Sequence, residues 1–107
     1  MAPSLPEHGQ ELEMQKKNLF LSLLLLDSVE EVSAFTDAIF SDKEIDAAAK
    51  RWCATRKRLE GKSNKESADE CHAHPNTVSQ VNMRILRQHE TICKEMHRRL
   101  RSFLESG

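Results

Sequence analysis

The eight residues Leu19–Leu26 constrain the fold of this chain more than any other segment, because only Ser22 among them is polar. A helix that is apolar on nearly every side has to be covered on every side. A chain of 107 residues buries only a limited fraction of its own surface. The run therefore predicts that a second copy of the chain covers it. We expect a homodimer in which residues 10–60 form a helical dimerisation core.

The same run imitates a signal peptide, since Lys16 and Lys17 precede it. It has no small-residue cleavage site, acidic residues lie before it, and Asp27 ends it. It is also far too short to span a bilayer. We interpret it as a buried helix of a cytoplasmic protein that has no membrane partner.

Composition predicts an all-α protein. The chain has no Tyr, three Gly and three Pro, and residues that favour strands are few. Its three Cys, at positions 53, 71 and 93, have no paired spacing and predict reduced thiols instead of a disulfide framework. Two of the three Pro lie in residues 1–9, which we expect to be a flexible tail.

Helix boundaries are indicated by capping patterns. The first helix is predicted from about Gln10 to Asp27. Ser28 and Ser41 each begin a Ser-x-x-Glu capping box, which predicts helices to about residues 40 and 60. Gly61 is suited to end the second of these. A last helix is expected within residues 89–107, from about 90 to 104.

Residues 61–88 have the plan of a helix-turn-helix. Ser63 can cap a short helix to about residue 71, and Pro75 suits the first position of a second helix to about residue 87. Val78, Val81 and Ile85 would form the inward side of that second helix. In a helix-turn-helix the second helix lies in the DNA major groove.

Its outward side carries groups suited to DNA. Asn and Gln can read adenine through two hydrogen bonds, and basic side chains can meet phosphates. Residues 41–107 hold fourteen Lys and Arg against ten acidic residues, while residues 1–40 hold two against seven. This basic excess is compatible with a polyanion partner. The base-reading candidates are Asn76, Thr77, Ser79, Gln80 and Met83, and the phosphate candidates are Lys62, Lys65, Arg84 and Arg87.

Two positions depart from the usual helix-turn-helix pattern. Ser67 stands where Ile or Val normally packs, and His72 stands where a turn Gly is common. An alternative therefore stays open: a helical dimerisation module that contacts another protein and has lost specific DNA binding. An outward Met83 slightly favours that alternative.

The segment EGKSNKESADECHAHPNTVSQVN, residues 60–82, resembles the helix-turn-helix of the Trp repressor superfamily, particularly its YerC-type members. The run LFLSLLLLDSVEEVSAFTDAIFSDKEI is similar to the first helices of that family, so the resemblance covers about residues 18–88. It implies an all-helical, intertwined dimer acting as a transcriptional repressor. The matching positions of the first segment are Gly61–Ser63, Glu66, Ala68, Ala73, Thr77–Ser79 and Val81–Asn82.

The resemblance also implies an effector pocket at Arg51, Thr77 and Gln80. Arg51 matches one of the two Arg residues that sandwich tryptophan in the Trp repressor, and Thr77 matches a lining Thr. Gln80 occupies the place of the second Arg and cannot supply a planar cation. We therefore expect no tryptophan co-repressor and no other cofactor.

Cys71, His72 and His74 are metal-ligand types, and Cys93 lies four residues before His97. A tetrahedral zinc site needs four ligands, and we attribute these spacings to chance. No nucleophile–base set, phosphate loop or carboxylate pair points to an enzyme. The interpretation is a sequence-specific, DNA-binding regulator without a metal site.

Overall fold

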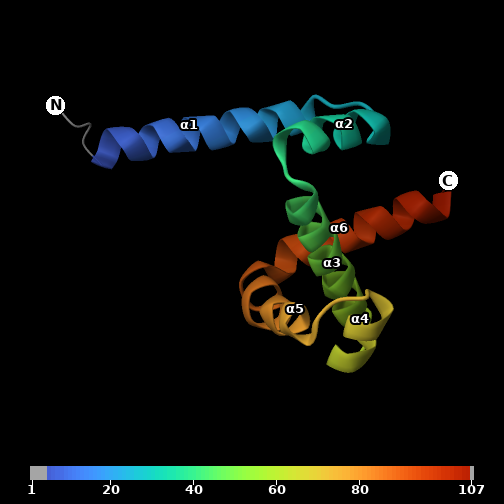
Figure 1. The fold of residues 1–107 in the computed structure, drawn as a ribbon. Coiled ribbons are helices and arrows are strands. Elements are labelled where there is room, and N and C mark those ends of the chain that lie inside the picture. Colours follow the sequence, from blue (N-terminus) through green and yellow to red (C-terminus); the bar gives the residue numbers. More distant parts are fainter. Residues whose placement is uncertain (1–4, 107) are drawn as a thin grey trace. The chain divides into compact units, whose positions relative to one another are not determined.

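The computed structural model of the protein describes residues 5–106, with side chains from residue 9 onward. It divides into a first compact unit that ends at Ser41 and a second that begins at Asp42. Every regular element in residues 5–106 is a helix (Figure 1), which confirms the predicted all-α class. Within this range, no helix combines the length and the apolar character needed to cross a membrane.

The first unit contains α1 (Leu5–Leu24) and α2 (Val29–Ile39). Helix α1 begins five residues before the predicted start and takes in residues 5–9, which the sequence analysis assigned to the tail; residues 1–4 lie outside the described range. Pro6 allows this start because the first turn of a helix leaves its N–H groups without intrahelical partners. The helix also ends earlier than predicted. The N–H of Leu26 bonds to the carbonyl of Leu23 in a tightened last turn.

Helix α2 begins where Ser28 predicted it. The Ser28 hydroxyl accepts the backbone N–H of Glu31 at 3.1 Å. The Glu31 carboxylate accepts the N–H of Asp27 at 2.7 Å, one residue before the position that a regular capping box uses. One free N–H of the first helical turn, that of Glu31, is thereby satisfied, and so is the N–H of Asp27 before the cap.

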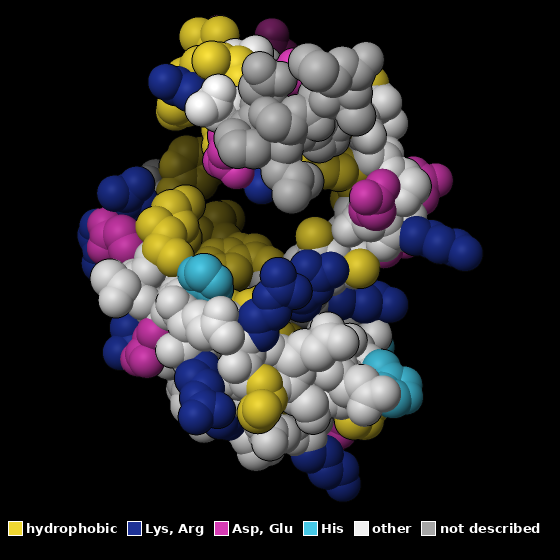
Figure 2. Space-filling view, turned by 90° about the vertical axis from the view of Figure 1, so that its left-hand side faces the viewer, with side chains coloured by type: hydrophobic (Ala, Val, Ile, Leu, Met, Phe, Trp, Pro, Cys, Tyr) yellow, Lys and Arg dark blue, Asp and Glu magenta, His cyan; other side chains and the backbone are white. Residues whose placement is uncertain are grey.

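Much of the apolar run is exposed in the first unit. Leu24 and Leu25 are each 79% exposed. Hydrophobic side chains lie open on the face drawn in Figure 2. The strongly exposed apolar residues of the first unit include Phe20, Leu21, Leu24, Leu25, Val29 and Ile39.

The second unit is arranged around α3 (Asp42–Leu59), which packs against all the elements that follow it (Figure 1). Its core is small, because Val78 and Val81 are the largest apolar side chains buried in it. Ala54, Ala68 and Cys71 complete the core. The elements after α3 are α4 (Asn64–Glu70), α5 (Pro75–Gln80), the π-helix η1 (Val81–Leu86) and α6 (Arg87–Ser106).

Gly61 ends α3, as predicted. Its φ of +89° lies in the left-handed region that Gly adopts readily. The N–H of Gly61 bonds to the carbonyl of Arg58, and the N–H of Lys62 bonds to the carbonyl of Lys57, both at 3.0 Å. This is a Schellman motif, and it turns the chain directly into α4.

The helix that starts at Pro75 continues through η1 and into the first residues of α6. His89 breaks it, because its φ and ψ of −131° and 27° are not helical. The break lies between the predicted end near residue 87 and the predicted start of the last helix near residue 90. We call residues 75–88 the reading helix from here on, after the role that the sequence analysis predicts for them.

Helices α3 and α6 are joined through a buried histidine. Arg56 Nε donates to His97 Nδ1 at 3.1 Å, and His97 Nε2 lies 3.9 Å from Glu60 Oε1. Burial lowers the pKa of His97, the Arg56 guanidinium lowers it further, and Glu60 opposes the shift. His97 is therefore held neutral, which leaves Nδ1 free to accept the Arg56 hydrogen bond.

Cys53 and Cys71 form a disulfide, so the prediction of reduced thiols was wrong for these two residues. They are 18 residues apart in sequence, and the packing of α4 on α3 brings their Cα atoms to 5.8 Å. That separation is within the range a disulfide spans. Cys93 is a free thiol, and burial raises its pKa.

Candidate nucleic-acid interface

The first helix of the predicted motif, α4, is fixed at its start by a complete capping box. The Ser63 hydroxyl accepts the N–H of Glu66 at 3.1 Å, and the Glu66 carboxylate accepts the N–H of Ser63 at 3.0 Å. The backbone bond from Ser63, followed by its side-chain bond, holds the pKa of Glu66 below its usual value. Helix α4 therefore begins at a well-defined residue although it is only seven residues long.

The turn after α4 uses a left-handed residue. His72 has a φ of +51°, and it occupies the position where a turn Gly is common. A side chain in this conformation costs about 1–2 kcal/mol. The N–H of Ala73 bonds to the carbonyl of Ala68 at 2.9 Å and closes the turn. The departure noted in the sequence therefore leaves the turn intact but strained.

The reading helix begins with a histidine cap. His74 Nδ1 accepts the backbone N–H of Asn76 at 3.1 Å, and the His74 carbonyl accepts the N–H of Thr77 at 2.8 Å. Pro75 occupies the first helical position, where no N–H is needed. The start of the helix is thus satisfied by local bonds and leaves its outward side free.

The inward side of the reading helix packs as its spacing predicted. Val78 and Val81 are buried against α3 and α4, and Ile85 is partly buried beside them. Ala68 lies in the same core. Ser67 is fully buried, and its hydroxyl has no hydrogen-bond partner among the described residues. A larger apolar residue is usual there, so this contact is weaker than in a typical helix-turn-helix.

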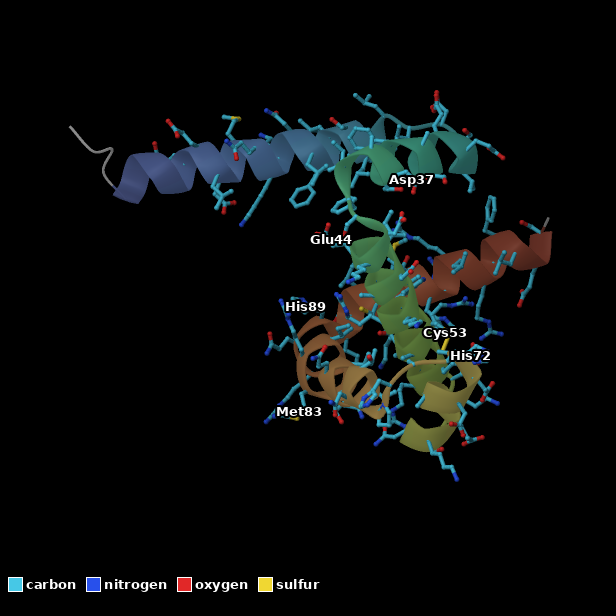
Figure 3. All side chains as sticks on the ribbon, in the orientation of Figure 1. Asp37, Glu44, Cys53, His72, Met83 and His89 are labelled. Atoms are coloured by element: carbon cyan, nitrogen blue, oxygen red, sulfur yellow. A yellow bond between two sulfur atoms is a disulfide. The ribbon has the colours of Figure 1, made fainter. Side chains whose placement is uncertain are left out.

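The outward side is polar and open. Asn76, Ser79 and Gln80 are exposed, while Thr77 is partly buried. Met83 is 62% exposed, and Figure 3 shows it projecting away from its helix. The candidate base-reading residues therefore lie on an accessible face, except that Thr77 is partly covered.

Three of the four phosphate candidates are exposed basic groups. Lys65, Arg84 and Arg87 make no ion pair within residues 9–106. Lys62 differs, because its Nζ lies 3.5 Å from the Glu70 carboxylate, which Lys57 also meets at 3.3 Å. Lys62 is therefore less available to a phosphate than the other three.

Asn82 connects three elements, a role that the sequence did not reveal. Its Oδ1 accepts Arg58 Nε at 3.1 Å, and its Nδ2 donates to Asn64 Oδ1 at 2.8 Å. Arg58 Nη1 also donates to the carbonyl of Lys62 at 2.6 Å. This network ties α3 to both helices of the motif. No periodic pattern predicts it, because each partner is polar and lies on a different element.

Arg51 and Gln80 line one polar pocket of about 520 Å³. They are two of the three candidate effector residues; Thr77 is not part of the lining. Arg84, Ile85 and His89 complete the wall. Arg84 supplies a second guanidinium, which the sequence had placed at phosphates only. The pocket is suited to a small polar or anionic group in contact with the reading helix.

No protein-family model, curated protein or solved structure matches this chain significantly. What this surface could bind is therefore inferred from the side chains of residues 61–89. A supported helix presents amides and a hydroxyl outward, and unpaired cations lie along it. Amides suit hydrogen bonding to base edges, and cations suit the phosphate backbone.

Proposed function

We propose that the protein is a sequence-specific DNA-binding regulator of transcription, a repressor that acts in the cytoplasm. It is a homodimer, and each copy binds DNA through the helix-turn-helix of residues 61–88. The observation that carries this proposal is the two-sided reading helix. Val78 and Val81 are buried on the side that packs on the core. Asn76 and Gln80 are exposed to solvent. A helix held in this way can enter a major groove without losing its own packing.

Charge supports the same function. Arg84 and Arg87 carry no internal ion pair in the described range, so their charges are free for phosphates. An internal ion pair would have to break before its cation could bind a phosphate. Arg84 and Arg87 do not carry this cost in the described range. Affinity is expected to fall as salt rises, by about 0.9 in log–log slope for each phosphate that is neutralised.

The exposed apolar residues of the first unit support the homodimer. Side chains such as Leu24 and Leu25 are mostly exposed in one chain, and such an apolar patch marks an interaction surface. The first 40 residues are net acidic, whereas the remainder is net basic. Contact between the acidic part of one copy and the basic part of another would combine charge complementarity with apolar burial.

The pocket lined by Arg51 and Gln80 is a candidate effector site. Gln80 in place of an Arg removes one of the two cations that hold tryptophan, so we do not propose tryptophan as a co-repressor. Arg84 lines the same pocket. A ligand there would touch both the reading helix and α3, which carries Arg51.

A selection from random duplex DNA tests the function. Full-length protein is mixed with a random duplex pool, bound DNA is recovered by gel shift, and the cycle is repeated at rising salt. The expected result is an enriched palindrome whose half-sites are about 34–36 Å apart, or a multiple of that.

A matched control is Arg98→Ala, because Arg98 already donates to Glu95 on α6. This variant should select the same sequence with the same affinity. Failure to enrich any sequence, by a protein shown to be folded and dimeric, would favour the alternative of a protein-interaction module.

A further inference from the structure

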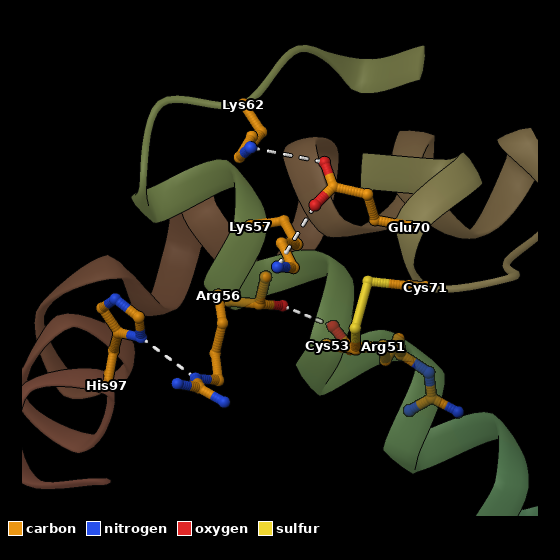
Figure 4. The surroundings of a disulfide bond; sticks show 9 residues. Arg51, Cys53, Arg56, Lys57, Lys62, Glu70, Cys71 and His97 are labelled. Atoms are coloured by element: carbon orange, nitrogen blue, oxygen red, sulfur yellow. Dashed lines mark hydrogen bonds and ion pairs between the residues drawn. A yellow bond between two sulfur atoms is a disulfide. The ribbon is translucent and has the colours of Figure 1, made fainter. Parts of the chain in front are cut away.

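The disulfide lies at the turn of the proposed DNA-binding motif. Cys53 belongs to α3, and Cys71 caps the C-terminus of α4 (Figure 4). Their Cα atoms are 5.8 Å apart, so the bond can form without moving the backbone. The central helix of the second unit is thus covalently joined to the turn of the motif.

Cys71 is directly connected to the start of the reading helix. Only His72 and Ala73 lie between it and the cap residue His74. The N–H of Cys71 bonds to the carbonyl of Ser67 at 3.1 Å, which closes α4 immediately before the turn. The position of the Cys71 backbone therefore determines where the reading helix begins.

Three features weaken the packing of this turn. Its core consists of small side chains, and the buried Ser67 hydroxyl has no partner in the described range. His72 adds a left-handed conformation that a non-Gly residue adopts at a cost. These terms favour opening of the turn, and the covalent link between Cys53 and Cys71 opposes it together with the Asn82 network and the Lys57–Glu70 ion pair.

An ion pair lies close to the disulfide in the sequence of both helices. Lys57 follows Cys53 by four residues on α3, which places it on the same helix face. Its ammonium pairs with Glu70, the residue before Cys71, at 3.3 Å (Figure 4). The disulfide and this ion pair therefore join the same two helices.

We infer that Cys53 and Cys71 are a reversible redox switch that sets the position of the reading helix. The disulfide form holds the helix on α3 and binds DNA, and the dithiol form releases it. The DNA-binding part of this inference rests on the proposed function. The switch also agrees with the proposed location in the cytoplasm, since disulfides of cytosolic proteins are usually transient or redox-sensing.

The chemistry balances with a peroxide and a dithiol. One thiolate attacks hydrogen peroxide to form a sulfenic acid, and the other thiol then displaces water from that sulfur. Two thiols and one peroxide thus give one disulfide and two waters. A dithiol reverses the change through two exchange steps, and it is itself oxidised to a disulfide.

The test compares oxidised and reduced full-length protein by two measurements. One is amide hydrogen exchange of residues 72–80, and the other is fluorescence anisotropy with the selected duplex. Excess dithiothreitol should reduce the pair in the folded protein and lower the protection of residues 72–80. If about one molecule in ten then keeps a competent reading helix, affinity falls about tenfold.

Two variants sharpen the comparison. Cys93→Ser retains the disulfide and should respond to reduction like the natural protein. The double variant Cys53→Ala with Cys71→Ala should resemble the reduced protein under all conditions and show no response. Circular dichroism establishes that both variants are folded.

The outcomes separate this inference from the proposed function. Equal protection in both redox states overturns the switch, even if the duplex binds. A disulfide that resists excess dithiothreitol in the folded protein also overturns it. Redox-dependent protection without any duplex binding supports the switch and refutes the DNA-binding function. Redox-dependent protection with unchanged affinity overturns control of DNA binding.

Discussion

His74 Nδ1 accepts the backbone N–H of Asn76 at 3.1 Å, so a titratable side chain caps the helix proposed to read DNA. A neutral imidazole can accept this bond, whereas a protonated imidazole has two donors and no acceptor. The protonated form would also place a positive charge at the positive end of the helix dipole. Near DNA, however, the same charge attracts a phosphate.

We therefore predict that a hydroxyl acceptor improves this cap. His74→Ser should stabilise the free protein by about 1 kcal/mol, because a hydroxyl oxygen is among the preferred acceptors for a free N–H at a helix start. Chemical denaturation measures this gain in the free energy of unfolding. His72→Ser, which lies before the helix start, is the matched control and should not show the gain. Unchanged stability of His74→Ser would contradict the capping role.

Base reading and phosphate binding are predicted to separate by mutation. Gln80→Ala should cost about 1–3 kcal/mol at the selected site and relax base choice there. Arg87→Ala should weaken binding to all sequences about equally and reduce the salt slope by about one. Affinities for the selected and the scrambled duplex at several salt concentrations measure both effects. An unchanged sequence preference in Gln80→Ala would contradict its reading role.

Stability is predicted to fall in mild acid because of His97. Burial and Arg56 lower its pKa in the folded protein, so the unfolded state binds the proton more readily. Its contribution to the free energy of unfolding is then complete above the ordinary His pKa of about 6.5 and is lost as the pH falls below it. Chemical denaturation between about pH 7.5 and 5 measures this. His97→Gln, which retains an acceptor for Arg56, should flatten the profile.

Ser67 provides a test of the weak core. Its hydroxyl is buried without a partner in the described residues, and burying such a group costs about 1–3 kcal/mol. Ser67→Ala should therefore raise the free energy of unfolding by about 1 kcal/mol. Ser79→Ala, on the exposed side of the same motif, is the matched control and should change little. Destabilisation by Ser67→Ala would mean that the hydroxyl has a partner after all.

The homodimer is tested at the apolar run. Leu23→Asp should unfold the protein instead of yielding folded monomers, because we expect the same leucines to form the core of both copies. Burying an unpaired carboxylate costs several kcal/mol. Circular dichroism and sedimentation together measure folding and mass. A natural protein that sediments as a stable monomer at micromolar concentration would refute the dimer.

Sequence reasoning located the local features of this fold well. The helix-terminal residues Ser28, Ser63 and Gly61 make hydrogen bonds or turns with residues close to them in sequence. Their roles can therefore be predicted from the order of the residues alone. The inward Val78 and Val81 follow from helical spacing for the same reason. The all-α class follows from composition.

Features that depend on tertiary packing were missed. Cys53 and Cys71 are joined only because α4 folds onto α3. The hydrogen bond that Arg56 donates to His97 spans 41 residues, and the one that Asn82 donates to Asn64 spans 18. Polar pairs at such separations carry no periodic signal. The start of α1 was missed because Pro6 was taken as a sign of irregular chain, although the first turn of a helix tolerates it.

The π-helix η1 changes the angular phase of the side chains that follow Gln80. In a continuous α-helix, residues advance about 100° each, so Arg87 would stand nearly above Gln80 after seven steps. A π-turn takes i→i+5 bonds and accommodates about one extra residue, which displaces every later side chain by roughly 100°. Gln80 and Arg87 then face different directions. If the helix enters a DNA groove as proposed, the π-helix Val81–Leu86 would separate a part that meets bases from a part that meets the sugar–phosphate backbone.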